Sequence, residues 1–244
     1  MEITIGHLYP DLLNLYGDRG NIMALVRRLE WRGIGAKIRE YRLHDDIDFA
    51  ALDIVFLGGG SDREQMLVCA RLREIRSAFA DYVESDGAVI AICGGYQLLG
   101  EYYRMGDAVI EGLRILDVRT ENEPGRLIGN VVIRSPLSSM PIVGFENHGG
   151  RTYIGEHTPL GRVITGGGNN GKDGHEGVQY KNVLGTYLHG PLLPKNPELC
   201  DWILRAALLR KGYTSELAPL DDTMEITANR AVAERFAGKM AKRP

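Results

Sequence analysis

The sequence predicts an α/β fold: a doubly wound, mostly parallel sheet with helices on both faces and added antiparallel strands. Two observations lead to this prediction. In the first hundred residues, short apolar runs alternate with longer helical patterns. Residues 54–57 and 88–92 are continuous apolar runs, as is typical of parallel strands that are covered on both faces. Sheets of this kind bind ligands at the carboxyl ends of their strands.

The elements of the first half follow in order. Asn21 is expected to cap a helix over residues 22–32, which carries apolar side chains on one face and stops at Gly33. A long helix over residues 65–85 precedes the strand at residues 88–92. The other expected strands are residues 3–9, 36–41 and 53–57, and residues 10–20 form a loop.

After Gly100 the glycines become frequent and the expected strands short. We expect them to be antiparallel strands added to the sheet, at residues 111–118, 125–134, 142–145, 162–165, 176–180 and 183–188. Residues 166–171 match the spacing GxGxxG, but no helix follows and Asn170-Gly171 is a strong hairpin signal, so we expect a turn and no dinucleotide site.

Two further helices are expected at the end of the chain, over residues 194–211 and 222–241, with an irregular linker at 214–219. A basic tail with Lys239, Lys242 and Arg243 follows and is expected to be solvated. We expect a single domain over residues 1–244, in which residues 197–244 form a helical extension.

Composition excludes several classes of function. The 244 residues are 44% hydrophobic and 25% charged, as in ordinary globular proteins. A net charge of −3 provides no basic field for nucleic acid. No apolar run approaches the ~18 residues of a membrane span, and the chain starts directly with a strand, so we expect neither membrane insertion nor a secretory signal. Three widely spaced cysteines favour a reducing, cytoplasmic compartment.

Cys93 is the candidate nucleophile. It ends an apolar, β-branched strand and is followed by Gly94, Gly95 and an apolar helix start. A strand that turns sharply into a helix holds the side chain between them in an exposed position, the arrangement called a nucleophile elbow. The helix also directs its N-terminus at the sulfur, which favours the thiolate. A lone cysteine is more often a small buried hydrophobe, and we interpret Cys69 and Cys200 in this way.

Three glycines, Gly58 to Gly60, close a neighbouring strand at the same edge of the sheet. Backbone N–H groups of Gly60 or Ser61 and of Gly94 are therefore expected to converge on one oxygen, as in an oxyanion hole. The alternative interpretation is a tight turn without further role.

A thiol nucleophile needs a base. Among six histidines, His189 follows the strand over residues 183–188 and precedes a glycine, so it too is expected at a strand's end. His148 is the second candidate. The histidines and cysteines show none of the spacings of a zinc site, and we expect no metal on this chain.

Two segments carry a resemblance to a known family. Residues 92–100, Ile-Cys-Gly-Gly-Tyr-Gln-Leu-Leu-Gly, and residues 187–191, Tyr-Leu-His-Gly-Pro, resemble class I, triad-type glutamine amidotransferases of the cobyric acid synthase-like branch. Residues 15–22 and 144–152 further resemble the small glutaminase subunit of two-chain enzymes that amidate the D-glutamate of lipid II. The resemblance covers essentially the whole chain and implies a flavodoxin-like fold.

The resemblance also implies roles for individual residues. Cys93 would attack the side-chain amide of L-glutamine, form a thioester and release ammonia, with His189 as the base. Gly60 and Gly94 would bind the oxyanion. Gln97 would contact the substrate, and Arg126 would hold its α-carboxylate, for which a guanidinium fork is well suited.

One position departs from the class. Standard triads place a glutamate two residues after the histidine, where this chain has Pro191. Three alternatives remain open for the group that orients His189: a carboxylate elsewhere in the chain, such as Glu146, a carboxylate of a partner protein, or no such group in a Cys–His dyad.

The sequence contains no GxxxxGK[ST] motif, so we expect no cofactor on this chain. The resemblance implies that ammonia passes to a Mur ligase-like synthetase, a separate subunit that binds ATP and Mg²⁺. Three other functions stay open: the glutaminase component of a cobyrinic or cobyric acid-type synthase, a Cys–His peptidase or esterase, and a scaffold without activity.

Overall fold

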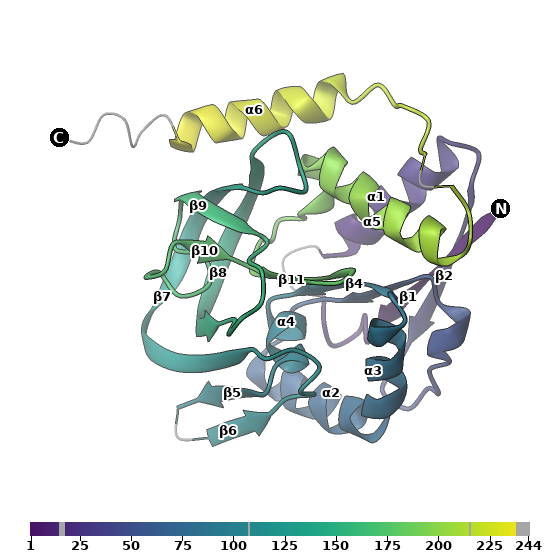
Figure 1. Ribbon diagram of the computed structural model, residues 1–244. Coiled ribbons are helices and arrows are strands. Elements are labelled where there is room, and N and C mark those ends of the chain that lie inside the picture. Colours follow the sequence, from purple (N-terminus) through teal and green to yellow (C-terminus); the bar gives the residue numbers. More distant parts are fainter. Residues whose placement is uncertain (15–17, 107, 215, 238–244) are drawn as a thin grey trace.

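Two sheets lie side by side in the computed structural model, which describes residues 1–14, 18–106, 108–214 and 216–237 (Figure 1). The first sheet has the strand order β11-β12-β4-β3-β1-β2. All neighbouring pairs in it are parallel except β11 and β12. Its strands are β1 (Glu2–Leu8), β2 (Gly35–Tyr41), β3 (Ile54–Leu57), β4 (Ala88–Ile92), β11 (Val178–Tyr180) and β12 (Val183–Thr186).

Helices cover both faces of the first sheet (Figure 1). Helices α1 (Arg19–Glu30) and α5 (Pro197–Arg210) lie on one face, and α2 (Asp62–Glu74) and α3 (Arg76–Glu84) on the other. A short helix, α4 (Gly94–Leu99), follows β4 directly. Two 3-10 turns, η2 (Phe49–Ala51) and η3 (Leu193–Lys195), precede β3 and α5.

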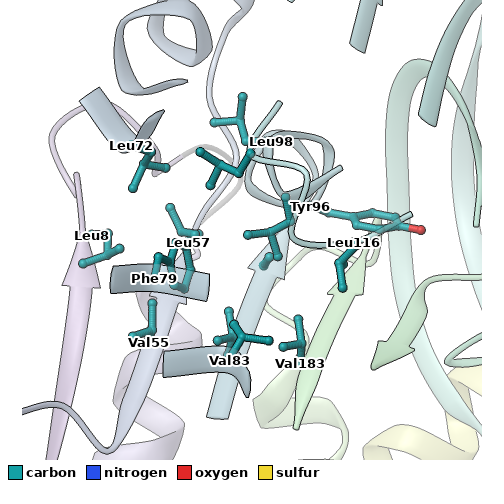
Figure 2. Close-up of a cluster of buried hydrophobic side chains, with 14 of the residues drawn as sticks. Leu8, Val55, Leu57, Leu72, Phe79, Val83, Tyr96, Leu98, Leu116 and Val183 are labelled. Atoms are coloured by element: carbon teal, nitrogen blue, oxygen red, sulfur yellow. The ribbon is translucent and has the colours of Figure 1, made fainter. Parts of the chain in front are cut away.

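The alternation of side chains along each strand divides the apolar residues between two cores. In β3, Val55 and Leu57 belong to the core under α2 and α3, which Figure 2 shows, whereas Ile54 and Phe56 belong to the core under α1 and α5. This two-sided burial is the physical reason why the central strands are apolar without interruption.

Two expectations about the helices are corrected. The expected helix over residues 65–85 is interrupted at Ile75, whose φ of −109° and ψ of 16° are not helical. Asn21 does not cap α1 but lies inside it, where its side-chain oxygen accepts a hydrogen bond of 2.8 Å from the N–H of Leu193. Asp18 occupies the cap position instead and makes no side-chain cap hydrogen bond.

The second sheet differs most from expectation, because its strands form a separate sheet in the order β10-β9-β7-β5-β6, with β8 paired to β7. Only β11 is an antiparallel addition to the first sheet, β12 is parallel to β4, and residues 112–118 form no strand. The strands are β5 (Tyr102–Met105), β6 (Ala108–Glu111), β7 (Arg119–Arg134), β8 (Ile142–Tyr153), β9 (Gly161–Thr165) and β10 (His175–Glu176).

The turn expected around Asn170 joins β9 to β10, and the Asn170 side chain accepts hydrogen bonds from the N–H groups of Lys172 and Asp173. Helix α6 (Thr223–Ala237) lies across the second sheet, with Ala233 packed on Val132 and Val143 (Figure 1). The basic tail predicted from the sequence lies outside the described residues. Within the described ranges, no helix has both the length and the apolar character needed to cross a membrane.

Candidate active site

Cys93 lies in a sharp turn between β4 and α4. Its φ of 51° and ψ of −105° are unusual for a residue with a side chain, so the turn is strained. Two backbone hydrogen bonds hold it: the N–H of Cys93 donates to Thr186 at 2.8 Å, and the N–H of Gly95 donates to Gly58 at 3.1 Å. The side chain is partly exposed. The elbow is therefore fixed by both neighbouring strands.

His189 is buried just beyond β12. Its backbone pairs with Phe145 of β8 through hydrogen bonds of 2.8 and 3.2 Å, which tie the loop after β12 to the second sheet. The loop after β3 brings the two candidate groups together. A Cβ atom built on Gly59 would lie 3.3 Å from Cβ of Cys93 and 3.3 Å from Cε1 of His189. Cys93 and His189 thus meet at one edge of the first sheet.

A third residue, Asp18, stands beside His189 and was missed by the sequence analysis. Its side chain is fully buried, Oδ2 accepts a hydrogen bond of 2.9 Å from the N–H of Gly59, and Oδ1 lies 3.6 Å from Nδ1 of His189. Burial alone would lower the pKa of His189, but hydrogen bonding and charge from Asp18 and Cys93 outweigh it and raise the pKa to about 9. The imidazole is therefore protonated at neutral pH. An aspartate in a glycine-rich loop is also a common turn residue, so no local signal singled it out.

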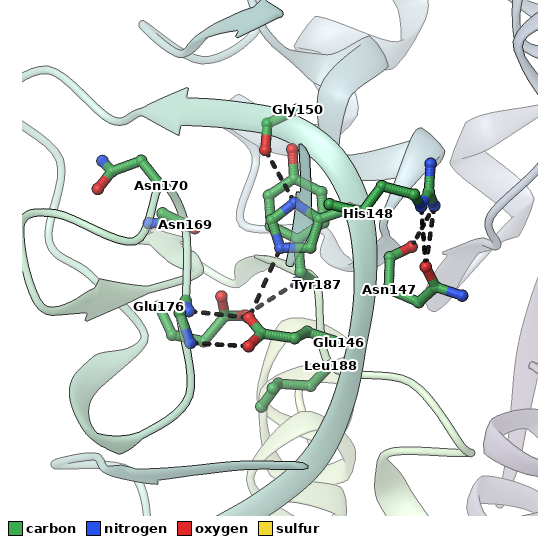
Figure 3. A network of polar contacts seen from close by, with 12 residues as sticks. Glu146, Asn147, His148, Gly150, Asn169, Asn170, Glu176, Tyr187 and Leu188 are labelled. Atoms are coloured by element: carbon green, nitrogen blue, oxygen red, sulfur yellow. Dashed lines mark hydrogen bonds and ion pairs between the residues drawn. The ribbon is translucent and has the colours of Figure 1, made fainter. Parts of the chain in front are cut away.

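Glu146, the carboxylate named in the sequence analysis as a possible orienter, is placed elsewhere. It accepts hydrogen bonds from the N–H groups of Gly167 at 2.7 Å and Gly168 at 2.9 Å, and lies 3.7 Å from Nε2 of His148 (Figure 3). His148 in turn stacks on Tyr187, with ring centroids 3.6 Å apart. The structure therefore pairs Glu146 with His148 rather than with His189.

The loop after β3 narrows the choice of oxyanion donors. The N–H of Gly59 is bonded to Asp18, and the N–H of Ser61 donates to Glu64 at 2.8 Å within a capping box at the start of α2. Ser61, which the sequence analysis left open as a donor, is therefore already engaged. Of the two candidates in this loop, Gly60 and Ser61, Gly60 therefore stays the expected donor, and Gly94 begins α4.

A cavity of about 220 Å³ opens beside Cys93. Arg126 lies at its wall, where Nε and Nη2 donate to the side-chain oxygen of Asn147 at 3.1 and 3.0 Å. Gln97 lines it too, and its amide donates to the hydroxyl of Tyr187 at 3.0 Å. Among the described residues of the lining, Arg126 supplies the one guanidinium and Asp62 the one carboxylate. The full lining is Gly60, Ser61, Asp62, Gln65, Cys93, Gln97, Tyr103, Arg126, Asn147, His148, Gly149 and Gly150.

The structure thus brings together most of the residues predicted from the sequence. Gly60, Gln97 and Arg126 share the cavity with Cys93, and His189 lies beside Cys93, with Gly59 close to both. Within the described parts of the chain, no three His, Cys, Asp or Glu side chains are grouped so that they could hold a metal ion. Cys69 and Cys200 are buried in α2 and α5, away from this site.

Among solved structures, glutamine amidotransferases have a similar fold. One from Thermotoga maritima superposes with a TM-score of 0.55 at 15% sequence identity, covering 96% of this chain and 98% of that one. Another glutamine amidotransferase gives a TM-score of 0.51 at 19% identity, over 83% of this chain and 98% of that one. At this level of identity the likeness concerns the fold, and it agrees with the α/β class predicted from the sequence.

Comparison of the sequence gives more similar relatives. The chain is 47% identical, over 96% of both sequences, to the Staphylococcus aureus protein named lipid II isoglutaminyl synthase (glutamine-hydrolyzing) subunit GatD. It is 39% identical to the protein of the same name from Streptococcus pneumoniae, over 99% of this chain and 93% of that one. A cobyric acid synthase from Listeria innocua is 34% identical, but over 59% of this chain and 29% of its own length.

The model of the CobB/CobQ-like glutamine amidotransferase domain matches residues 4–197. This stretch begins in β1, contains Asp18, Cys93 and His189, and ends at the start of α5. Together with the near full-length relatives, the match shows that this chain belongs to the CobB/CobQ-like glutamine amidotransferase family.

Proposed function

We propose that this chain is the glutaminase subunit of a two-chain amidotransferase: it hydrolyses L-glutamine to glutamate and ammonia and passes the ammonia to a Mur ligase-like partner. The partner binds ATP and Mg²⁺ and uses the ammonia to amidate the D-glutamate of the lipid II stem peptide, a step of peptidoglycan biosynthesis. No cofactor is assigned to this chain. The near full-length relatives, named as glutamine-hydrolysing subunits of lipid II isoglutaminyl synthase, support the proposal.

The chemistry begins at the sulfur. With His189 protonated at neutral pH, the reactive form is a thiolate beside an imidazolium, in which the imidazole has taken the thiol proton. The thiolate of Cys93 attacks the side-chain carbonyl carbon of glutamine, and a C–S bond forms. The C–N bond then breaks as the imidazolium gives its proton to the leaving amine, which departs as ammonia.

Hydrolysis of the thioester completes the cycle. His189, now neutral, takes a proton from water as the oxygen attacks the thioester carbon. Glutamate leaves when the C–S bond breaks, and the proton on the imidazole restores the starting ion pair. The N–H groups of Gly60 and Gly94 bind the oxyanion that develops in both steps, because the N–H groups on either side of Gly60, those of Gly59 and Ser61, are engaged.

The cavity suits a free amino acid. The Arg126 fork, held by Asn147, would bind the α-carboxylate of glutamine. Asp62 would bind the α-ammonium, and its Oδ1 already accepts a hydrogen bond of 3.3 Å from the hydroxyl of Tyr103. Gln97 would contact the substrate between these ends and Cys93. A single guanidinium and a single carboxylate in one lining match the two charges of the substrate.

The proposal places the enzyme in the cytoplasm, as a heterodimer with its synthetase, because a thiol nucleophile stays reduced there. The observation that carries the proposal is the meeting of Cys93 and His189 next to Gly59, beside a cavity that Arg126 lines. The test addresses the bond that is cleaved, the side-chain amide of glutamine.

The experiment measures glutamate and ammonia released from L-glutamine by the purified chain, alone and with the synthetase subunit. We expect weak activity alone and stronger activity with the partner. Cys93→Ala should reduce turnover by at least ~1,000-fold, whereas the matched control Cys69→Ala, which alters a buried thiol in α2, should not. Full activity of Cys93→Ala would falsify the proposal.

The same preparation separates the proposal from a Cys–His peptidase or esterase. The glutamine analogue 6-diazo-5-oxo-L-norleucine should alkylate Cys93 and leave Cys69 and Cys200 unmodified, as read by peptide mass spectrometry. A peptidase should ignore this analogue and cleave peptide or ester substrates. Ammonia transfer to a corrin carboxylate rather than to lipid II would instead favour a cobyrinic or cobyric acid-type synthase.

A further inference from the structure

One peptide of the loop after β3 is held at both of its polar groups. The carbonyl of Gly58 accepts a hydrogen bond of 3.1 Å from the N–H of Gly95, and the N–H of Gly59 donates to Asp18 at 2.9 Å. This peptide lies directly before the one that carries the N–H of Gly60, the expected oxyanion donor of the loop. The plane before that N–H is therefore fixed.

The peptide that follows Gly60 is held in the same way, by two side chains in the first turn of α2. The N–H of Ser61 donates to Glu64 at 2.8 Å, and the carbonyl of Gly60 accepts a hydrogen bond of 3.1 Å from Nε2 of Gln65. Glycine has wide freedom in φ and ψ, so the direction of the Gly60 N–H depends on bonds of this kind. Gln65 is the side chain that binds Gly60 itself.

Gln65 also touches the second expected donor. A Cβ built on Gly94 would lie 2.7 Å from Nε2 of Gln65 and 2.8 Å from its Cδ, so the amide lies against the backbone of Gly94. The N–H of Gln65 donates to the carbonyl of Ser61 at 2.9 Å, which places the residue in the first turn of α2, where side chains point back toward the N-terminus of the helix. One side chain therefore reaches both residues whose N–H groups are expected to bind the oxyanion.

Packing alone does not explain an amide on the buried face of α2. The other buried residues of this helix are hydrophobic: Val68, Cys69 and Leu72. Gln65 is 4% exposed and lines the cavity beside Cys93, and its buried Oε1 makes no hydrogen bond to any described residue. A buried acceptor without a partner lowers stability, so packing would favour an apolar side chain here. What glutamine adds is the donor on Nε2.

We infer that Gln65 is a positioning residue of the oxyanion hole: its Nε2 holds the Gly60 peptide so that the N–H of Gly60 points, together with that of Gly94, at the oxygen of the tetrahedral intermediate. When the thiolate of Cys93 adds to the side-chain carbonyl of glutamine, the π electrons move onto this oxygen, and the two N–H groups bind the negative charge. The inference rests on the proposed function. It adds a side chain that acts through the backbone and only where an oxyanion forms.

The test is Gln65→Met, which keeps the length of the side chain and removes the donor. One unpartnered buried acceptor, the carbonyl of Gly60, then replaces another, Oε1 of Gln65, so we expect the midpoint of chemical denaturation to change little. The N–H of Gly60 is still present but less well directed, so kcat for glutamine hydrolysis should fall by ~10- to 100-fold. KM should change less than about 3-fold.

Two reactions of Cys93 separate the oxyanion hole from the nucleophile. The burst of p-nitrophenol from p-nitrophenyl acetate passes through a tetrahedral oxyanion, so Gln65→Met should slow it by the same factor as kcat. Alkylation by iodoacetamide displaces iodide from a saturated carbon and forms no oxyanion, so its rate should stay within about 2-fold of wild type. Gln179→Met, the same substitution in β11 and outside the cavity lining, is the matched control and should change neither rate.

The outcomes are distinct. Wild-type kcat in folded Gln65→Met, alone or with the synthetase subunit, would overturn the inference. Equal losses of acylation and alkylation would overturn it too, because the substitution would then have disturbed the thiolate of Cys93. If the wild type itself releases no ammonia from glutamine, the proposed function fails, and the p-nitrophenyl acetate burst still tests Gln65. If Gln65→Met does not fold, Gln65→Asn decides by the same two rates, because its side chain is one methylene too short to reach Gly60.

Discussion

Cys93 and His189 lie beside each other, and the same glycine packs against both. The strands that carry them are neighbours in the sheet, with Thr186 of β12 paired to Ile92 of β4, and a Cβ on Gly59 would lie 3.3 Å from an atom of each side chain. The nucleophile and its base are thus held by three parallel strand ends at once. This explains how two residues almost a hundred positions apart reach one site.

The first prediction concerns Gly59. In Gly59→Ala, the new methyl group would lie 3.3 Å from both Cβ of Cys93 and Cε1 of His189, closer than nine in ten contacts of this kind. We expect the two groups to be pushed apart, with kcat reduced at least ~10-fold and the free energy of unfolding lowered by about 1–3 kcal/mol. The control is Gly129→Ala in β7, where a Cβ meets no atom within 4 Å. Equal kinetics for both variants would contradict the assigned geometry.

The second prediction concerns pH. The pKa of His189 is raised from 6.5 to about 9, against the effect of burial, by Asp18 and Cys93. The protonated ring donates to the leaving amine, so kcat/KM should hold through neutral pH and decline as pH rises through about 9, where this proton is lost. Initial rates measured between about pH 6 and pH 10 would show this decline of kcat/KM. A decline centred near 6.5 would mean that the ion pair is absent from the free enzyme.

The third prediction concerns substrate binding. Arg126→Lys replaces a planar fork by a point charge and removes both side-chain bonds to the oxygen of Asn147. We expect KM for glutamine to rise by ~10- to 100-fold while kcat stays within a few-fold. Arg104→Lys in β5, whose arginine bonds Glu121 at the surface, is the control. If kcat falls instead and KM does not move, Arg126 acts on the reaction rather than on binding.

The fourth prediction concerns stability. Asp201 of α5 accepts hydrogen bonds of 2.7 to 3.1 Å from the buried guanidinium groups of Arg28 and Arg32, and these outweigh burial and lower the pKa of Asp201. Asp201→Asn removes the carboxylate that the two buried cations share and leaves Arg28 only its bonds to Asp222. We expect the free energy of unfolding to fall by about 3–5 kcal/mol.

Chemical denaturation measures this loss. The control, Glu30→Gln, breaks an exposed pair with Arg27 and should cost less than about 1 kcal/mol. Activity per folded molecule should be retained in both variants, because this cluster joins α1 to α5 and does not line the cavity. If Asp201→Asn lowers the free energy of unfolding no more than Glu30→Gln does, the buried cluster contributes little to stability.

The sequence by itself determined the parts that depend on local pattern. Continuous apolar runs identified β3 and β4 because both of their faces are buried. The Cys-Gly-Gly turn identified the elbow because the chain packs closely there: a Cβ on Gly95 would lie 2.8 Å from Cβ of Leu57. Cys93 and His189 each follow a predicted strand, and this placed them at the same edge of the predicted sheet. Local pattern did not separate α2 from α3, whose junction at Ile75 carries no proline or glycine.

Only the tertiary structure decided what depends on contacts between distant segments. Sequence pattern cannot say which strands pair, so the later strands were assigned to the first sheet although most form a second one. Nor can it distinguish a carboxylate that meets an imidazole from one in a turn or a helix cap. Asp18, and not Glu146, lies beside His189. The N–H of Gly59 holds the Asp18 carboxylate in place, whereas the N–H groups of Gly167 and Gly168 hold the carboxylate of Glu146.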